Sequence, residues 1–431
     1  MIVRDMVRSR SIFVGEIKLC ICKTRRMTTL AQEGAARIEW IRSRMTMLAE
    51  IRSELQQTTP FAGHRIGMSL HLEPKTAVLL ETLAAGGAEI VATGNHGSTQ
   101  DDVVAALRET GMTLFGRRDD SIEQHHTNIA AVLDSNPDML LDNGGDLAAG
   151  IVARDAAAHV IGGTEETTSG GLRLRGELAG RVPFPMIVIN DSMLKAIGEN
   201  RHGVGQSVLE SFMRITNVMV PGRHVLVIGY GWCGRGIAES FRALGAQVAV
   251  AEVDELKGFE AALDGFRVGS TAELLGWADV VITATGQPGV LNAADFAHLR
   301  DGVILANSGH FPWEIDVPAL HAASTGSRTI ADALERIDLP DGRHVILLAE
   351  GRMVNLAGRD PKGNSLEAMD LGFMLQVLSL ERVATVHDAA GHDSTAHDST
   401  AHALLAGPQP VPRDIERRIA RAFLSALDSA R

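Results

Sequence analysis

Cysteine, aromatic residues and positive charge are scarce in this sequence, and each shortage excludes a class of protein. Three cysteines among 431 residues, two of them at Cys20 and Cys22, do not form a disulfide framework, which indicates a reducing, cytoplasmic setting. A formal net charge of −12 argues against a nucleic-acid partner, because a phosphate backbone binds positive protein surfaces. No apolar run approaches the ~20 residues that a membrane helix needs. A protein with neither a nucleic-acid nor a membrane partner is expected.

Residues 1–26 differ from the rest of the chain. They carry seven Arg or Lys residues against two acidic ones. Transit peptides are basic and poor in acid, but extra residues before a start at Met27 are the interpretation that we favour. No apolar core of about 7–15 residues follows the basic residues, so no secretory signal is predicted. We expect residues 1–26 to be a disordered tail.

Apolar and polar residues alternate in blocks along the remaining chain. Apolar residues make up 45% of the sequence, which is enough for a large core, and the length indicates two or three domains. From Arg65 onward, strand-like runs such as RIGMSLHL and AEIVATG alternate with helix-like runs such as TAVLLETLAAGG. This alternation predicts mostly parallel sheets, with ligands at the carboxyl ends of the strands. One amphipathic helix is predicted at residues 31–56 and another at 412–430.

A glycine-rich turn follows a short apolar run at residues 225–228. The turn fits G-x-G-x-x-G and consists of Gly229, Gly231, Trp232, Cys233 and Gly234. Its glycines allow a tight turn, close approach of a pyrophosphate, and packing of the following helix, whose N-terminus attracts phosphate. Glu252 ends the next predicted strand, where a carboxylate binds a ribose 2′-hydroxyl and repels a 2′-phosphate. The sequence therefore predicts NAD as the cofactor rather than NADP, although Lys257 lies close by.

These features divide the chain into predicted domains. The fold class is α/β, with two doubly wound parallel-sheet domains, the NAD-binding Rossmann domain being inserted in a substrate domain. The boundaries are a substrate domain at 27–202, the NAD-binding domain at 203–356, a return to the substrate domain at 357–386, a linker at 387–410 and a C-terminal helix at 411–431. The linker contains His387, His392, His397 and His402 at intervals of five residues. That spacing distributes histidines around a helix, so we predict a solvated linker and no metal site.

Several long motifs, in this order, resemble the S-adenosylhomocysteine hydrolase (adenosylhomocysteinase) family. They are HLEPKTAVLLETL, NHGSTQDD, LLDNGGDL, GGTEETTSG, INDSMLKAIGENRHGVGQS, VIGYGWCGRG, NSGHFPWEIDV and LLAEGRMVNL. The resemblance runs from about Arg37 to Gln376. It implies two domains that close over a nucleoside substrate, and a homo-oligomer, dimer or tetramer. In the family, bound NAD oxidises the ribose 3′-hydroxyl, a base removes the C4′ proton, the 5′ group leaves, water adds, and the ketone is reduced again.

The resemblance assigns catalytic roles residue by residue. Lys195 matches the lysine that helps to deprotonate the 3′-hydroxyl, and Glu199 replaces an aspartate. Glu166 matches the glutamate that binds the ribose hydroxyls. His71 and His310 match two histidines suited to proton transfer and closure.

Further binding residues follow from the same motifs. The implied cofactor contacts are Thr167, Thr168, Ser169, Asn200, Thr285, Gly286, Ser308, Gly309 and Asn355, the last of these at the nicotinamide amide. The implied substrate contacts are Glu73, Lys75, Thr76, Asn95, Ser98, Asn364 and Met369.

Further positions besides Glu199 depart from the family pattern, among them Val204 in place of a cysteine. The adenine-side motif H-x-T-x-E-T has Glu73 and Lys75 in place of threonine and glutamate. Lysine only donates hydrogen bonds, so Lys75 either pairs with Glu73 or donates to a carbonyl such as O6 of hypoxanthine. Asn143 replaces an aspartate proposed for proton transfer near C5′, and Asn364 replaces a histidine. The changes affect base recognition and the 5′ proton relay, whereas the residues for oxidation at C3′ remain.

Three hypotheses for the function follow. The first is a specialised nucleoside dehydratase, which oxidises C3′, loses water across C4′–C5′ and reduces the ketone without adding water back. The second is reversible hydrolysis of S-adenosylhomocysteine, or of S-inosylhomocysteine, which suits Lys75. The third is a non-catalytic regulatory paralogue, against which the retained Lys195, His71 and Glu166 argue. A dehydrogenase that releases NADH is less favoured than any of these.

Overall fold

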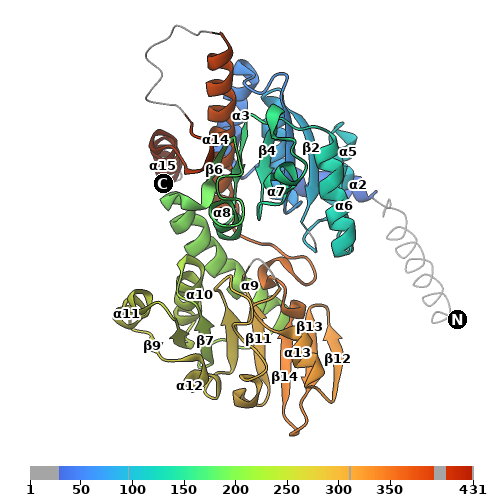
Figure 1. Cartoon of the computed structure of the whole chain (residues 1–431). Helices are drawn as coiled ribbons and strands as arrows, with labels where there is room; N and C mark the ends of the chain where they lie inside the picture. Colours follow the sequence, from blue (N-terminus) through green and yellow to red (C-terminus); the bar gives the residue numbers. More distant parts are fainter. Residues whose placement is uncertain (1–28, 96, 310–311, 393–403, 430–431) are drawn as a thin grey trace, which may run out of the picture.

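The computed structural model describes residues 29–95, 97–309, 312–392 and 404–429, and these form two α/β domains (Figure 1). One contains a seven-stranded sheet in the order β15-β6-β5-β4-β1-β2-β3, and the other an eight-stranded sheet in the order β12-β13-β14-β11-β10-β7-β8-β9. The predicted α/β class, with an NAD-type Rossmann domain inserted in a second domain, is confirmed. No helix in the described part of the chain combines the length and the apolar character needed to span a membrane.

The first sheet is parallel throughout, and its central strands are buried on both faces. Its strands are β1 (Arg65–Leu70), β2 (Glu89–Gly94), β3 (Thr113–Phe115), β4 (Met139–Asp142), β5 (Gly162–Glu165), β6 (Pro185–Val188) and β15 (Gly407–Pro410). The helices of this domain include α4 (Pro74–Ala85), α5 (Asp101–Glu109), α6 (Ile122–Asp134), α7 (Asp146–Ala153), α8 (Thr168–Arg175) and α14 (Leu366–His392). Strands buried on both faces read as continuous apolar runs, as in MLLD of β4.

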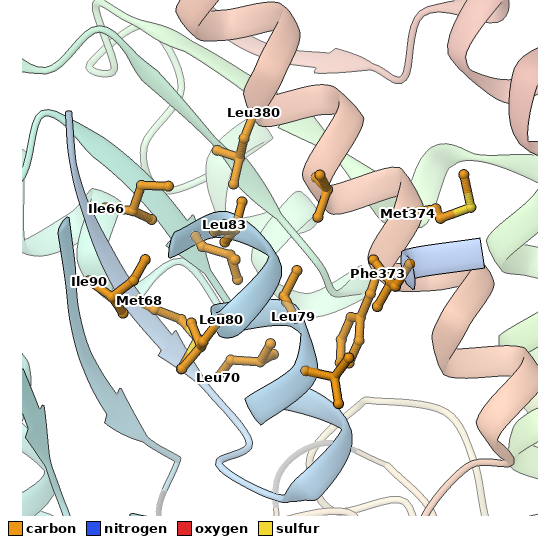
Figure 2. Close-up of a cluster of buried hydrophobic side chains, with 14 of the residues drawn as sticks. Ile66, Met68, Leu70, Leu79, Leu80, Leu83, Ile90, Phe373, Met374 and Leu380 are labelled. Carbon is orange, nitrogen blue, oxygen red and sulfur yellow. The ribbon is translucent and has the colours of Figure 1, made fainter. Parts of the chain in front are cut away.

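The core of this domain joins segments that lie far apart in the sequence. Figure 2 shows strand residues such as Ile66 and Met68 facing Leu79 and Leu83 of α4, with Phe373 of α14 in the same cluster. All five side chains are fully buried. The return segment of the chain is therefore part of the substrate-domain core.

The second sheet has the topology of a dinucleotide-binding domain with an added hairpin. Its strands are β7 (His224–Ile228), β8 (Gln247–Ala251), β9 (Arg267–Val268), β10 (Val280–Thr283), β11 (Val303–Asn307), β12 (Gly326–Ala331), β13 (Leu334–Asp338) and β14 (His344–Leu348), with helices α9 (Val204–Thr216), α10 (Trp232–Ala243), α11 (Glu255–Leu263), α12 (Thr271–Leu275) and α13 (Val317–Ala322). Strand β7 lies between β10 and β8, which is the switch point where such sheets bind ligands. Strands β12 and β13 are antiparallel, so this sheet is not entirely parallel as predicted.

Two segments connect the domains. The first is a π-helix, η3 (Lys195–Gly203), which continues without a break into α9. The second runs from β14 through the short turns η5 (Ala349–Gly351) and η6 (Val354–Leu356) to α14. The boundary proposed at 202/203 thus falls inside a continuous helical segment.

The single helix predicted at residues 31–56 is wrong, because two helices occupy this region. They are α2 (Leu30–Arg42) and α3 (Thr46–Thr58). Met45 leaves the helical conformation at φ −84° and ψ 75° and is fully buried. The carboxylate of Asp370, on α14, accepts hydrogen bonds from the backbone N–H groups of Met47 (3.0 Å) and Leu48 (2.9 Å). An acceptor more than 300 residues away caps α3, and no local pattern reveals it.

We expect Asp370→Ala to lower the free energy of unfolding by about 1–3 kcal/mol, because two buried N–H groups lose their acceptor. Burial raises the pKa of Asp370 to about 6, although the two N–H groups oppose that rise. A carboxyl whose pKa is higher in the folded state favours folding at low pH, and this contribution is lost as pH rises from about 4 to about 6.

Urea unfolding at pH 4 and pH 7 tests both expectations. Asp370→Asn keeps one acceptor, so it should lose less stability than the alanine variant, and its stability should depend less on pH than the wild-type stability does. An alanine variant as stable as the wild type at both pH values would contradict the capping role.

The linker predicted for residues 387–410 is wrong at both ends. Helix α14 continues to His392, and Gly407–Pro410 forms the edge strand β15, which pairs in parallel with β6. Its two prolines cannot donate to a ladder, but an edge strand tolerates them. His397 and His402 lie outside the described residues, as does the segment 1–26.

Candidate active site

Polar residues follow the carboxyl ends of several strands of the first sheet. Asn143 comes directly after β4 and Glu166 directly after β5, while Asn95 and His71 follow β2 and β1. The carboxyl ends of parallel strands meet at one edge of a sheet, so these side chains from distant motifs are brought together.

A hydrogen-bonded chain links three of the predicted residues. The Asn95 amide nitrogen Nδ2 donates to Oδ1 of Asn143 at 2.7 Å, and Nδ2 of Asn143 donates to Oε2 of Glu166 at 2.8 Å. Ser69 Oγ donates to Oδ1 of Asn95 at 3.3 Å. All four side chains are buried. Asn143 therefore holds the Glu166 carboxylate in place and has no proton of its own to transfer.

The π-helix η3 contributes a buried ion pair. Lys195 Nζ donates to Oε1 of Glu199 at 2.7 Å, and both side chains are less than a tenth exposed. Burial lowers the pKa of Lys195, but Glu199 and Glu166 outweigh it and raise the pKa overall. Burial raises the pKa of Glu166 to about 7, with Lys195 lowering it and Glu199 raising it. One cation thus faces two carboxylates, on a type of helix that is frequent at functional sites.

Two further buried carboxylates support the site. Glu165 accepts hydrogen bonds from the backbone N–H groups of Gly144 (3.1 Å), Gly145 (3.0 Å) and Thr167 (2.7 Å), and from the Thr167 hydroxyl. Burial, followed by the charge of Asp142, raises the pKa of Glu165 to about 8. The sequence analysis missed Glu165. The adjacent pair Glu165-Glu166 at the end of a strand was the available signal, since neighbouring strand residues face opposite sides of a sheet.

The motif around His71 forms a second polar group. His71 Nδ1 lies 2.7 Å from Ser98 Oγ, and the Thr76 hydroxyl donates to the His71 carbonyl at 2.6 Å. Lys75 Nζ lies 3.0 Å from Oε2 of Glu73, with both side chains about nine-tenths buried or more. Of the two alternatives considered for Lys75, the structure contains the ion pair with Glu73.

Lys75 also contacts the return segment of the chain. Its Nζ donates to the backbone carbonyl of Lys362 at 2.7 Å. An ammonium group has three N–H donors, so one donor is left for a ligand.

The glycine turn has the properties that a pyrophosphate requires. Gly229 has φ +101°, and a Cβ on it would lie 2.7 Å from the Ala284 carbonyl oxygen. A Cβ on Gly234 would lie 1.9 Å from the Gly229 carbonyl oxygen, whereas one on Gly231 would meet nothing within 4 Å. The first and third glycines are therefore needed for the turn and its packing, and the second leaves room for a ligand to approach.

The carboxylate of Glu252 is fixed beside this turn. It accepts hydrogen bonds from the backbone N–H groups of Tyr230 (2.6 Å), Val253 (2.8 Å) and Asp254 (3.0 Å). The exposed Lys257 pairs instead with Asp254 at 3.5 Å. The Glu252 side chain is thus fixed beside the turn, which agrees with NAD.

The loop after β10 is held by a residue that the sequence analysis missed. Glu314 is fully buried and accepts hydrogen bonds from Thr285 N and Oγ1 (both 2.9 Å) and from Gly286 N (2.8 Å). A Cβ on Gly309 would lie 1.7 Å from Glu314. The available signal was a charged residue inside NSGHFPWEIDV, which resembles a family motif. Three predicted cofactor residues, Thr285, Gly286 and Gly309, surround this carboxylate.

Asn355 offers an open acceptor between the domains. Its Nδ2 donates to Ser207 Oγ at 3.1 Å, and Ser207 Oγ donates to Oδ1 of Asn364 at 2.9 Å. Oδ1 of Asn355 is buried and has no hydrogen-bond partner among the described residues. A carboxamide N–H of nicotinamide would satisfy it, so the site fits NAD.

The remaining predicted residues have definite places. Asn200 donates to Asn190 Oδ1 at 2.9 Å, and Asn190 donates to Thr168 Oγ1 at 2.9 Å. Thr167 Oγ1 lies 3.1 Å from Ser169 Oγ. For three other predicted residues the structure gives a location but no link to the rest of the site. Ser308 Oγ is buried without a partner in the described structure, Trp232 lies beneath the Arg235 guanidinium, and Met369 packs against the hydrophobic core of the first domain.

Cys233 connects the glycine turn to the ion pair. It is the single cysteine among the described residues and lies in the first turn of α10. Burial raises the pKa of its thiol to about 11, while the charge of Lys195 lowers it. Since α10 also packs directly against η3, the turn and the Lys195–Glu199 pair are close neighbours.

His310 lies outside the described residues. Among the described residues, no group of three or more His, Cys, Asp or Glu side chains could hold a metal ion.

The Rossmann-type sheet carries a phosphate-binding turn, and this turn lies beside a buried lysine and two carboxylates of the second α/β domain. Such an arrangement defines an NAD-dependent enzyme. The chain belongs to the S-adenosyl-L-homocysteine hydrolase family. Residues 24–158 match the family model described as S-adenosyl-L-homocysteine hydrolase, and residues 200–360 match the model of its NAD binding domain.

Relatives of the chain fall into two kinds by name. An S-inosyl-L-homocysteine hydrolase of Methanopyrus kandleri is 42% identical over 405 residues, covering 93% of this chain and 92% of the relative. A second one, of Methanothermobacter thermautotrophicus, is 44% identical over 81% of this chain and 85% of the relative. An adenosylhomocysteinase of Aeropyrum pernix is 42% identical over 83% of this chain and 86% of the relative. Overall identity does not separate the two kinds.

Proposed function

We propose that this chain catalyses the reversible hydrolysis of S-inosyl-L-homocysteine, a 6-oxopurine nucleoside thioether. The observation that carries the proposal is the buried Lys75, which stands where the family motif has a glutamate. A glutamate accepts a hydrogen bond from a 6-amino group, whereas an ammonium can only donate and therefore suits a 6-keto oxygen. The Lys362 carbonyl accepts one of the three ammonium hydrogens and Glu73 forms an ion pair with the ammonium, so at least one hydrogen remains for the substrate. The two relatives named for this substrate support the same assignment.

The residues on the ribose side perform the first half of the reaction. Bound NAD supplies a reversible hydride acceptor. Glu166, held by Asn143, accepts hydrogen bonds from the ribose hydroxyls, and Lys195 stabilises the negative charge that develops when the 3′-hydroxyl loses its proton. Glu199 Oε2 is buried with no hydrogen-bond partner in the described structure and is available to this proton. Burial of these charges strengthens their interactions with the substrate, since a dry site screens them weakly.

The second half concerns the 5′ group. His71, oriented by Ser98, is suited to pass a proton to and from the 5′ group and the water that replaces it. Asn95 and Ser98 lie in the stretch that contacts the homocysteine part in the family.

One observation favours a second candidate function, which is 4′,5′-dehydration of a free nucleoside. Asn143 replaces an acidic residue and both ends of its amide are engaged, so it cannot add a proton to the 5′ relay. Loss of water from C5′ still requires a proton on the departing hydroxyl, which His71 would supply, whereas the return of water would lack the base that an acidic residue at position 143 provides. The buried Lys195, Glu199 and Glu166 argue against a non-catalytic paralogue.

Mass spectrometry of the NAD-containing protein with S-inosylhomocysteine, S-adenosylhomocysteine and inosine tests these functions. We expect homocysteine release from the inosyl thioether with a kcat/KM at least about 10²-fold above that for the adenosyl thioether, because the buried lysine mismatches a 6-amino group. A preference for the adenosyl thioether would contradict the proposal. Loss of one water from inosine, with NAD unchanged at the end, would favour dehydration.

We also infer a homo-oligomer, dimer or tetramer, from the family resemblance. Light scattering of the purified protein would measure its mass, and a monomer would contradict this inference.

A further inference from the structure

Gln376 is a buried polar residue that no function described above uses. It lies on α14 in the return segment, with none of its surface exposed. Neither its Oε1 nor its Nε2 has a hydrogen-bond partner in the described part of the chain. A buried amide without partners costs about 1–3 kcal/mol, so such a group in a native core calls for an explanation.

The face of α14 that carries Gln376 lies against the catalytic charges. Helix α14 packs on both β5 and η3. Gly372, four residues before Gln376 and on the same face, approaches Glu199 so closely that a Cβ there would lie 2.5 Å from Oε2. Gln376 therefore occupies the next turn along this face, toward the end of β5 and Glu166.

The surroundings of Glu166 support this placement. Burial raises its pKa to about 7, and the Gln376 amide lies near enough to lower that pKa, although it does not meet strict hydrogen-bond geometry in the structure. The charged groups that face Glu166 are Lys195 and Glu199, both from η3, while β4 presents the neutral Asn143 and α14 the neutral Gln376. Glu165, the adjacent residue on β5, instead binds the N–H groups of Gly144, Gly145 and Thr167.

We propose that Gln376 is a positioning residue that orients the Glu166 carboxylate toward the ribose from α14, as Asn143 does from the loop after β4. It acts through Glu166 and is therefore a positioning residue and not a catalytic one. Its amide keeps Glu166 ionised, and so able to accept hydrogen bonds from ribose hydroxyls, at a lower pH than burial alone would allow. The proposal rests on the role given to Glu166 under the proposed function.

Three variants of the NAD-containing enzyme test it through the pH profile of kcat/KM. Gln376→Met keeps the length of the side chain and removes the amide, so the apparent pKa of the acidic limb should rise by about one unit. Activity should then fall about 10-fold at pH 6 and less than about 3-fold at pH 9. Gln376→Glu adds a second negative charge beside Glu166 and should raise the apparent pKa of the acidic limb further. Ser379→Ala is the matched control, since Ser379 is an equally buried, unpartnered residue one turn further along α14, and its limb should not move.

An unchanged acidic limb in Gln376→Met, or a loss of activity that is equal at every pH as expected for a purely structural defect, would overturn the proposal. Binding of 3′-deoxyinosine and 3′-deoxyadenosine, measured by calorimetry between pH 6 and 9, gives a readout without turnover. Failure of the proposed function would appear in the wild type as no thioether cleavage, while failure of the Gln376 proposal would appear only in the comparison of variants. A wild type that binds neither deoxynucleoside would overturn both.

Discussion

Lys195→Met is expected to lower kcat by about 10³- to 10⁴-fold, the largest effect of any single substitution considered for this enzyme. The substitution removes the only cation that faces the carboxylates of Glu199 and Glu166 within the described structure. The developing charge on the ribose oxygen would lose its stabilisation, and two buried carboxylates would be left without a counter-charge. Turnover with each thioether measures the rate, and single-turnover oxidation of the 3′-hydroxyl, followed as NADH absorbance, shows which step is lost.

Stability must be measured alongside activity in this experiment. Breaking a buried ion pair costs about 3–5 kcal/mol, so Lys195→Met should also unfold at lower urea concentration. The double variant Lys195→Met/Glu199→Leu removes both charges, so it should recover part of the stability without recovering activity. Lys257→Met is the matched surface control, since Lys257 is exposed on α11, and it should retain near wild-type turnover. Substantial activity in Lys195→Met with NAD bound would contradict the role given to Lys195.

Substituting both Glu73 and Lys75 is expected to reverse the preference of the enzyme for the inosyl over the adenosyl thioether. The double variant Glu73→Thr/Lys75→Glu restores the family motif H-x-T-x-E-T and replaces a donor by an acceptor. The ratio of kcat/KM for the inosyl thioether to that for the adenosyl thioether should fall by about 10²- to 10⁴-fold, because a buried polar group rejects a ligand that leaves it unpaired. Competition between the two thioethers in one reaction, followed by mass spectrometry, measures this ratio directly.

Two single variants separate base recognition from a loss of structure. Lys75→Met removes the donor without adding an acceptor, so it should weaken the preference and leave neither thioether favoured. Lys75→Glu alone places a second carboxylate beside the buried Glu73, and it should be less stable than the double variant. If the double variant keeps the wild-type preference, Lys75 does not recognise the purine base. Other residues must then distinguish the adenosyl from the inosyl substrate.

The sequence predicted the elements whose signals are local. The glycine turn at Gly229, the strand before it and Glu252 after it form one contiguous pattern. Each glycine has the property that the pattern requires, because the close approaches at Gly229 and Gly234 arise within the turn or against the neighbouring strand end. The α/β alternation was equally readable, since strands buried on both faces are continuous apolar runs. The pairing of Lys75 with Glu73 needed only two residues of one motif.

Local patterns failed where a contact from elsewhere decides the conformation. The break between α2 and α3 depends on Asp370 from α14. Strand β15 contains two prolines and forms because β6 offers it an edge. Glu314 and Glu165 are buried acceptors for backbone N–H groups of loops, a role that residue type and spacing do not display.

The sequence by itself determined the fold class, the NAD turn and the family, because these depend on the order of residues along short segments. Only the tertiary structure decided which side chains share a site. It joined Asn95, Asn143 and Glu166 through hydrogen bonds across three strands, placed Cys233 beside Lys195, and set Gln376 among the groups around Glu166. The physical reason is that charge, burial and hydrogen bonding act over a few ångströms in space, and folding brings within that distance residues that are up to several hundred positions apart.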